Sequence, residues 1–400
     1  MEVLDSSYLG KSGSFDLMKR LNMEKVYKLI LMNQPTSRIE IAKASHLTQA
    51  TVSHCVKYLI ECGVVKEIGI MEKGMGRPPL KLVLNNDFGV FIGVEINFIG
   101  CRVLVTDING NEIYKEVFYG LYKNPIDFTN KIAEIALSYE RTGDPRKHVV
   151  GVGIATVGNY NHKTGVVEYI STMQNWNGYP LLMELERALE GIPCFVLHSS
   201  RAGLMGELHF GASSPMEDMA YICGGWGISL SVYVDGKIMY GNQGFAGRFG
   251  HTTIVANGKK CTCGNRGCLE AYSSLGALFP ELYHDAAFKQ EYFEDLIVRK
   301  KAGDAEVCQK IESILDYLVI GIVNVINIFN PSQICMGGLL GILFDGYMDE
   351  IYERIKKKAL PHFLNPFKIY TANLGEYGAA YGGISYTRDQ LIQILEMQTE

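Results

Sequence analysis

Long uninterrupted apolar stretches are missing from this sequence, and so is an N-terminal leader. The longest apolar run, residues 317–329, is interrupted by Asn324 and Asn327, and it is shorter than the roughly 20 residues that a membrane-spanning helix needs. The first residues, MEVLD, lack the basic start and apolar stretch of a signal peptide. We therefore expect a cytoplasmic protein with no membrane partner, in which residues 317–329 form a buried helix.

Segments of low hydropathy and high charge, which disorder requires, are also absent. With 47% hydrophobic and 20% charged residues, the composition is globular, and 400 residues exceed one ordinary core, so we expect two or three domains. A secreted disulfide framework is not indicated, because seven of the ten cysteines stand singly in apolar segments, as reduced core cysteines do. These seven are Cys55, Cys62, Cys101, Cys194, Cys223, Cys308 and Cys335.

The net charge of −5 is unevenly distributed along the chain. Residues 1–87 hold 12 Lys and Arg against 9 Asp and Glu, a balance of +3, whereas the remainder holds 26 against 34, a balance of −8. A basic N-terminal segment on an acidic body fits a head that meets phosphate groups and a body that does not.

The first 85 residues predict three helices. Apolar residues recur at helical spacing within 23–33, and the chain breaks at Gln34–Pro35. Thr36 and Ser37 can then cap a second helix, and Thr48 can cap a third, because their side-chain oxygens accept the unpaired amides of a first turn. The buried stripe of the third helix would consist of Val52, Cys55, Val56 and Leu59.

The opposite face of this third helix is polar, as a helix that reads base edges in a major groove requires. It carries Gln49, Thr51, Ser53, His54 and Lys57. Val64 and Val65 then begin a strand, and residues 69–84 predict a two-stranded wing, whose glycine-rich tip presents Lys73 and Arg77 to a phosphate backbone or minor groove. The order predicts a winged helix-turn-helix that binds a double-stranded DNA operator. The alternative is a three-helix bundle with an ordinary solvated face.

The rest of the chain predicts an α/β body. Strands at 91–96, 101–107 and 112–120 form a meander with a hairpin signal at Asn109–Gly110, and a helix at 125–140 leads to a buried strand at 149–157. The strand, turn and strand order recurs at 220–241. The recurrence predicts a duplicated body with a cleft between two lobes.

A cluster of metal-ligating residues lies in the second half. His251, Cys261, Cys263 and Cys268 form a Cys₃His set, which structural Zn²⁺ prefers, and the nearby Gly264 and Gly267 permit a tight turn. Four protein ligands leave no open position, so the predicted zinc is structural. The alternative is three unligated loop cysteines beside an unrelated histidine.

Residues 244–251 (GFAGRFGH) and 261–270 (CTCGNRGCLE) closely resemble the signature of the ROK family of sugar kinases and sugar-responsive repressors. Further matches cover nearly the whole chain: GVGIATVG at 151–158, Asn175–Trp176, Gly206–Glu207 and NVINIFNPSQICMGG at 324–338. With a winged head, the chain resembles the repressor branch, the group of xylose, N-acetylglucosamine and glucose-phosphotransferase regulators.

The resemblance implies an α/β fold in which a winged helix-turn-helix precedes a two-lobed, actin- or hexokinase-like body with a structural zinc site. The expected domains are the DNA-binding head at 1–85, a first lobe at 86–195 joined by a C-terminal helix at 377–400, and a second lobe with the zinc loop at 196–376.

Three departures from the family's kinases indicate that this chain is not an enzyme. The first phosphate loop reads Glu95-Ile-Asn-Phe-Ile99 where the kinases have an Asp, two Gly and a Thr, and the second, 223–227, has lost its threonine. At the kinases' Asn-Asp pair stand His198 and Ser199, and a serine is not basic enough to deprotonate a sugar hydroxyl. Two alternatives stay open: His198 as a substitute base, and an active sugar kinase with an appended DNA-binding head.

The resemblance also implies an effector pocket formed by Asn175, His198, Ser199, Arg248, His251 and Glu270. Arg248 stands where the family has a glutamate. It would recognise an anionic sugar derivative through paired hydrogen bonds, or else pair with Glu270 or point to solvent.

We therefore expect a homodimeric or tetrameric repressor of carbohydrate-utilisation genes that senses a sugar or an anionic sugar derivative. A constitutive DNA-binding protein with a decayed pocket is the third alternative.

Overall fold

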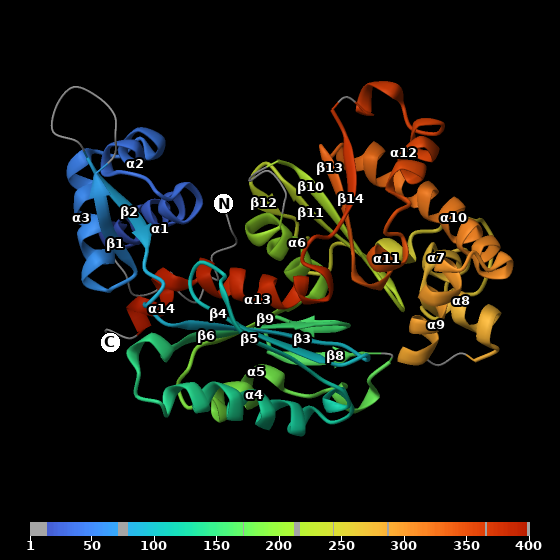
Figure 1. The fold of residues 1–400 in the computed structure, drawn as a ribbon, viewed down its shortest axis with the longest axis horizontal. Helices are drawn as coiled ribbons and strands as arrows, with labels where there is room; N and C mark the ends of the chain where they lie inside the picture. Colours follow the sequence, from blue (N-terminus) through green and yellow to red (C-terminus); the bar gives the residue numbers. More distant parts are fainter. Residues whose placement is uncertain are drawn as a thin grey trace.

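The computed structural model describes residues 14–70, 79–170, 172–211, 217–242, 244–285, 288–364 and 366–397. Figure 1 shows a small helical head, drawn in blue, beside a body of two sheets that each carry helices. The two C-terminal helices, drawn in red, run along the first sheet and end beside the head.

The head contains three helices and two strands: α1 (Ser14–Asn33), α2 (Arg38–Ser45), α3 (Gln49–Glu61), β1 (Val65–Ile70) and β2 (Leu80–Leu84). The predicted caps are confirmed, because Ser37 accepts from the amide of Glu40 and Thr48 from that of Thr51. Helix α1 begins earlier than the apolar pattern indicated. An Arg20–Glu24 ion pair one turn apart supports this extension.

The two strands of the predicted wing pair antiparallel, with Val65 opposite Leu84. Thr36 extends this small sheet, because its amide donates to the carbonyl of Leu82 at 3.1 Å and its carbonyl accepts from the amide of Leu82 at 2.7 Å. The wing tip with Lys73 and Arg77 lies outside the described residues.

The body contains two five-stranded sheets of the same design. The first has the order β5-β4-β3-β6-β9 and the second β12-β11-β10-β13-β14. In each, an antiparallel meander is followed by two parallel strands. The predicted duplication is thus confirmed. The strands are β3 (Val90–Ile96), β4 (Cys101–Thr106), β5 (Glu112–Phe118), β6 (Val149–Thr156), β9 (Cys194–His198), β10 (Met219–Gly224), β11 (Ile228–Val234), β12 (Lys237–Ile238), β13 (Gln333–Gly337) and β14 (Lys368–Thr371), and a separate hairpin is formed by β7 (Asn159–Asn161) and β8 (Val166–Tyr169).

Helices cover both sheets. Helices α4 and α5 lie on one face of the first sheet and α13 on the other, whereas α8 to α10 and α12 pack with the second sheet (Figure 1). Their bounds are α4 (Pro125–Glu140), α5 (Leu181–Ala188), α6 (Ser199–Phe210), α7 (Glu270–Ser273), α8 (Leu275–Tyr283), α9 (Gln290–Lys301), α10 (Ala305–Phe329), α11 (Gly338–Leu343), α12 (Met348–Lys356), α13 (Gly378–Asp389) and α14 (Leu391–Met397).

Helix α13 lies tightly between the first sheet and α6. A Cβ at Gly153 would be 2.1 Å from the carbonyl oxygen of Gly383, and a Cβ at Gly382 would be 1.7 Å from that of Ala202. Only glycine permits such backbone approach. The first sheet, α13 and α6 are therefore packed as one stack.

The head shares a hydrophobic core with the C-terminal helices. Val26, Tyr27 and Ile30 of α1 are buried in the same cluster as Ile384 of α13 and Leu391 of α14. An Arg20–Glu396 ion pair at 3.5 Å adds a polar contact between α1 and α14. The head is therefore attached to the body through packed side chains as well as through the chain.

Helix α10 is the one described helix that is long and apolar enough to span a membrane. It includes residues 317–329, for which a buried helix was predicted, and 56% of its apolar window is buried inside the molecule. It forms the centre of the second lobe's core, with Leu318, Ile322 and Ile326 almost fully buried. Such packing is typical of a core helix.

Candidate functional site

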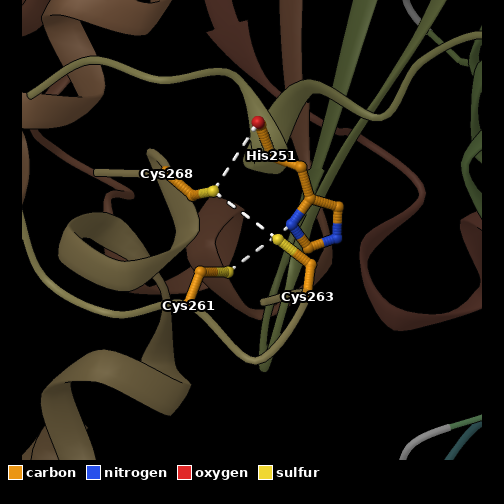
Figure 2. Close-up of side chains that lie close together, drawn as sticks. All are labelled: His251, Cys261, Cys263 and Cys268. Atoms are coloured by element: carbon orange, nitrogen blue, oxygen red, sulfur yellow. Dashed lines mark hydrogen bonds between the residues drawn. The ribbon is translucent and has the colours of Figure 1, made fainter. Parts of the chain in front are cut away.

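The four predicted metal ligands converge (Figure 2). His251 ends a short 3-10 helix (Phe249–His251), and the three cysteines lie on the loop that leads to α7. The ligand atoms of all four residues lie within 4.8 Å of one another. Cys261 Sγ is 3.6 Å from His251 Nδ1, and Cys263 Sγ is 3.7 Å from Cys268 Sγ.

These spacings match a tetrahedral ion. Bond lengths of about 2.3 Å to sulfur and about 2.0 Å to nitrogen place tetrahedral ligands about 3.8 Å apart for two sulfurs and about 3.5 Å apart for sulfur and nitrogen. Burial raises the pKa of the Cys268 thiol to about 12, whereas the backbone N–H of Asn265 lowers that of Cys263. A bound divalent cation would hold both as thiolates. The residues therefore fit a structural zinc ion.

Glu270 begins α7 two residues after the last cysteine of the cluster. Its Oε2 accepts from the amide of Ile228 at 3.0 Å, and a Cβ at Gly227 would be 2.8 Å from the same oxygen. The segment that carries the four predicted metal ligands and ends at Glu270, residues 251–270 (the metal loop), thus places a carboxylate at the start of β11. Glu270 is not one of the residues that line the cavity between the two lobes.

A cavity opens between the lobes, and the empty space in and before it, open solvent included, is about 340 Å³. Its lining residues come from the β7 region of the first lobe, from the start of α6, and from β11 and the loop after β12 in the second lobe. They are Gly158, Tyr160, His162, His198, Ser200, Arg201, Ser229, Gly244, Phe245, Ala246, Gly247 and Arg248. Polar, cationic and aromatic side chains therefore meet in this hollow from both lobes.

Two of the six predicted effector residues, His198 and Arg248, line this cavity. Ser199 is buried beside it, and within the described part of the chain its hydroxyl has no hydrogen-bond partner. Asn175 lies elsewhere and donates to the carbonyl of Lys123 at 3.0 Å. His251 and Glu270 belong to the metal loop, as described. The structure therefore does not bring the six together.

Arg248 reaches from the second lobe to the first. Its Nη2 donates to Asn159 Oδ1 at 2.5 Å and lies 3.4 Å from the carbonyl oxygen of Gly158. Among the described residues it has no ion-pair partner, so the anticipated pairing with Glu270 is not formed.

Arg201 is a cavity residue that the sequence analysis missed. Its side chain is buried, with 4% of its surface exposed, and its guanidinium lies 4.8 Å from the centre of the Tyr240 ring and donates to the carbonyl of Gly244. The available signal was an arginine inside an otherwise small and apolar helix directly after a buried strand. A charged residue in such a position needs a partner.

The two cavity histidines are neutral at physiological pH. Burial, with the guanidinium groups of Arg248 and Arg201, lowers the pKa of His198 to about 3, and burial with Arg201 lowers that of His162 to about 4. His198 Nδ1 accepts from the amide of Ser200, which leaves its Nε2 to carry the proton. His198 is therefore a poor base.

Aromatic side chains join the two former phosphate loops. The rings of Phe98 and Trp226 are 6.0 Å apart, and Phe288 lies 5.1 Å from Phe98 and 6.0 Å from Trp226. The three rings come from three separate segments, and two of them belong to the stretches that the sequence analysis aligned with the phosphate loops of the family's kinases.

The predicted DNA-reading face is exposed on α3. Gln49, Ser53, His54 and Lys57 are exposed, whereas Thr51 is half-buried and its hydroxyl lies 2.9 Å from that of Thr48 at the helix start. Thr51 therefore supports the cap. Lys57 lies 3.6 Å from Glu61, an exposed pair that phosphate could displace at little cost.

Fold and site together define a sugar-kinase type of body that carries a winged helix-turn-helix and a Cys₃His cluster. The model of the ROK family matches residues 91–390, and the chain belongs to this family.

Three similar proteins illustrate the relationship. A protein named xylose repressor from Bacillus spizizenii is 28% identical over 95% of this chain and 98% of its own length. The crystal structure of a ROK family transcriptional regulator, described as a homologue of the E. coli Mlc protein, is similar with a TM-score of 0.80 and 25% identity over 95% of this chain and 98% of that one. A ROK hexokinase from Thermus thermophilus shares the fold, with a TM-score of 0.61 and 23% identity over 78% of this chain and 100% of that one.

Proposed function

We propose that this chain is a DNA-binding transcriptional regulator that represses carbohydrate-utilisation genes and responds to a sugar or sugar derivative in the cavity between the lobes. The main support for this proposal is the share of the chain over which each relative is similar to it. The relative named xylose repressor is similar over 95% of the chain, whereas the hexokinase, aligned over its full length, covers 78%. The exposed polar face of α3 supports the same function.

The test is selection of genomic fragments by the purified full-length protein, followed by a mobility-shift assay on the enriched fragments. We expect a roughly palindromic site beside genes of sugar uptake or breakdown, because a symmetric dimer presents two recognition helices to two half-sites. Enrichment of no sequence over random fragments would overturn the proposed function.

The domains that we propose are the head at 1–85, a first lobe predicted at 86–195 and completed by 377–400, and a second lobe predicted at 196–376; the boundary between the lobes belongs after His198, because β9 pairs with β6 up to that residue. Helix α6 supports a route between cavity and head. His198, Ser200 and Arg201 lie at its start, and about 18 Å further on, by the rise of a helix, its last residue is Phe210. The Phe210 ring lies 4.2 Å from the Arg388 guanidinium, within reach of the core shared with α1.

Replacing Phe210 with alanine is expected to reduce by about five-fold or more the change in operator affinity that a cavity-bound sugar causes, since coupling energies are typically 1–3 kcal/mol. Binding of the sugar itself should stay unchanged in a calorimetric titration. Phe363→Ala, which removes another half-buried ring in the second lobe, is the matched control. Full coupling in Phe210→Ala would exclude this route.

We further propose that the Cys₃His cluster holds a structural Zn²⁺. Bound there, the ion would supply charge that keeps the cysteines as thiolates and would tie the loop from His251 to Glu270 into one geometry. The match of the sulfur and nitrogen spacings to a tetrahedral ion supports this assignment.

We also propose that phosphoryl transfer has been lost. A coupled assay with ATP and a panel of hexoses should show no ADP release above background, and Ser199→Asp, which restores a carboxylate, should not recover it because Phe98 and Trp226 fill the phosphate region. Sugar-dependent turnover by the unmodified protein would favour the alternative function, a kinase with a DNA-binding head.

A further inference from the structure

The lining of the cavity between the lobes carries positive charge, and the carboxylate that acts on it from outside, Glu270, opposes the lowering of the Arg248 pKa without forming an ion pair. Arg201 and Arg248 are among its twelve lining residues, and none of the twelve is an aspartate or glutamate. Among the described residues, neither guanidinium has an ion-pair partner. A cavity made for a neutral sugar needs no such pair of cations.

Of the two arginines, Arg201 has the greater need of a counter-ion, because only 4% of its surface is exposed. Burial lowers its pKa against the opposing effect of Tyr240, and the nearby charge of Arg248 adds to the lowering. A buried cation without a counter-ion costs several kcal/mol, and this cost is offset when an anion binds beside it.

The N–H donors of the two guanidinium groups also favour an anionic ligand. A guanidinium carries five N–H donors. Arg201 donates to the carbonyl of Gly244, and Arg248 uses one nitrogen for its contacts with Gly158 and Asn159. Among the described residues, the other donors have no acceptor. Carboxylate and phosphate oxygens are the acceptors that such donors bind in pairs.

The remaining lining fits the body of a monosaccharide. His198, Ser200 and Ser229 offer donors and acceptors for hydroxyl groups, while Tyr160 and Phe245 offer ring surfaces for C–H groups. Helix α6 begins at this wall, so its positive end adds to the field of the two arginines.

We propose that the cavity binds a monosaccharide-sized anion, a sugar acid or a sugar phosphate, whose anionic group pairs with Arg201 and Arg248. This inference rests on the proposed function and names the class of effector. Because Arg248 also holds the first lobe through Asn159, an anion that draws its guanidinium away alters a contact between the lobes. Binding of the anion would therefore change how the two lobes contact each other, and α6 would transmit that change to the head.

The test is isothermal titration of the full-length protein with matched sets: xylose and xylonate, glucose with glucuronate and glucose 6-phosphate, galactose with galacturonate and galactose 6-phosphate, and inorganic phosphate alone. We expect at least one sugar anion to bind about ten-fold or more tightly than its neutral partner and than inorganic phosphate. Whether the carboxylate or the phosphate member binds identifies the source of the charge.

Arg201→Gln and Arg248→Gln should each weaken that anion about 10- to 100-fold, since a hydrogen bond to a charged group contributes about 1.5–3 kcal/mol. Arg187→Gln, which removes an exposed arginine on α5, should leave binding unchanged. Arg248 is itself exposed, so its variant tests the proposal even where the buried Arg201→Gln fails to fold.

Binding of a neutral sugar as tightly as its anion, unchanged affinity in Arg248→Gln, binding of inorganic phosphate alone, or binding of none of the compounds would each overturn the anionic effector. Operator binding is measured separately on the same samples. Its presence without anion selectivity contradicts this inference alone, whereas its absence contradicts the proposed function.

Discussion

Replacing Gln49 and His54 together by alanine is expected to weaken binding to the selected operator by about 100-fold or more, because each base-edge contact contributes about 1–3 kcal/mol of discrimination. Both side chains are exposed on α3, apart from its buried stripe, so the fold of the head should be unaffected. Mobility-shift titrations against the operator and against a scrambled duplex measure the effect. Affinity for the scrambled duplex should change little.

Lys57→Ala provides the contrasting variant. Lys57 lies near the far end of α3, and as a phosphate contact it should affect both duplexes equally and reduce the slope of log affinity against log salt by about one. Equal losses on both duplexes in Gln49→Ala/His54→Ala would contradict base reading by this face. An unchanged operator affinity in that double variant would show that α3 is not the recognition helix.

Cys263→Ser is expected to abolish metal binding and to lower the melting temperature by about 8 °C. A metal at 1,000 times its Kd stabilises the folded state by about 4 kcal/mol, and each kcal/mol corresponds to at least about 2 °C in a lobe of this size. Cys263 is exposed, so its sulfur contributes no core packing. Without a metal, the same substitution should cost less than about 0.5 kcal/mol.

Atomic absorption and thermal melts with and without a chelator measure this effect. The chelator should lower the melting temperature of the unmodified protein to that of Cys263→Ser and should leave the variant unchanged. Cys308→Ser, at a half-buried cysteine outside the cluster, should keep both the metal and the response to chelator. One zinc per chain in Cys263→Ser, with an unaltered melt, would remove the metal assignment.

The local elements were predictable because their signals are local. Ser37 and Thr48 cap helices through amides three residues away, and Pro125–Glu140 forms a helix over the predicted span. The β10–β11 meander likewise follows from alternating side chains around a short turn. The spacing of Cys261, Cys263 and Cys268 places the sulfurs together through the loop alone, which requires only a nearby imidazole to complete the set.

The cavity was less predictable because its walls come from distant parts of the chain. Arg201 follows a buried strand and Arg248 lies in a loop 47 residues later, yet both face the same hollow. Asn175, expected beside them, instead donates to the carbonyl of Lys123. A motif match aligns residues along a sequence, whereas the direction of each side chain depends on the packing around it.

The sequence by itself determined the family, the order of elements and the residues of the Cys₃His cluster, because each depends on residue identity over short spans. Only the tertiary structure decided that Arg201 and Arg248 line one cavity with no carboxylate among its lining residues, and that the rings of Phe98 and Trp226 come within 6.0 Å of each other. It also decided that α6 leads from that cavity to the core shared with the head. These features are contacts between segments far apart in the chain, and chain folding alone brings them together.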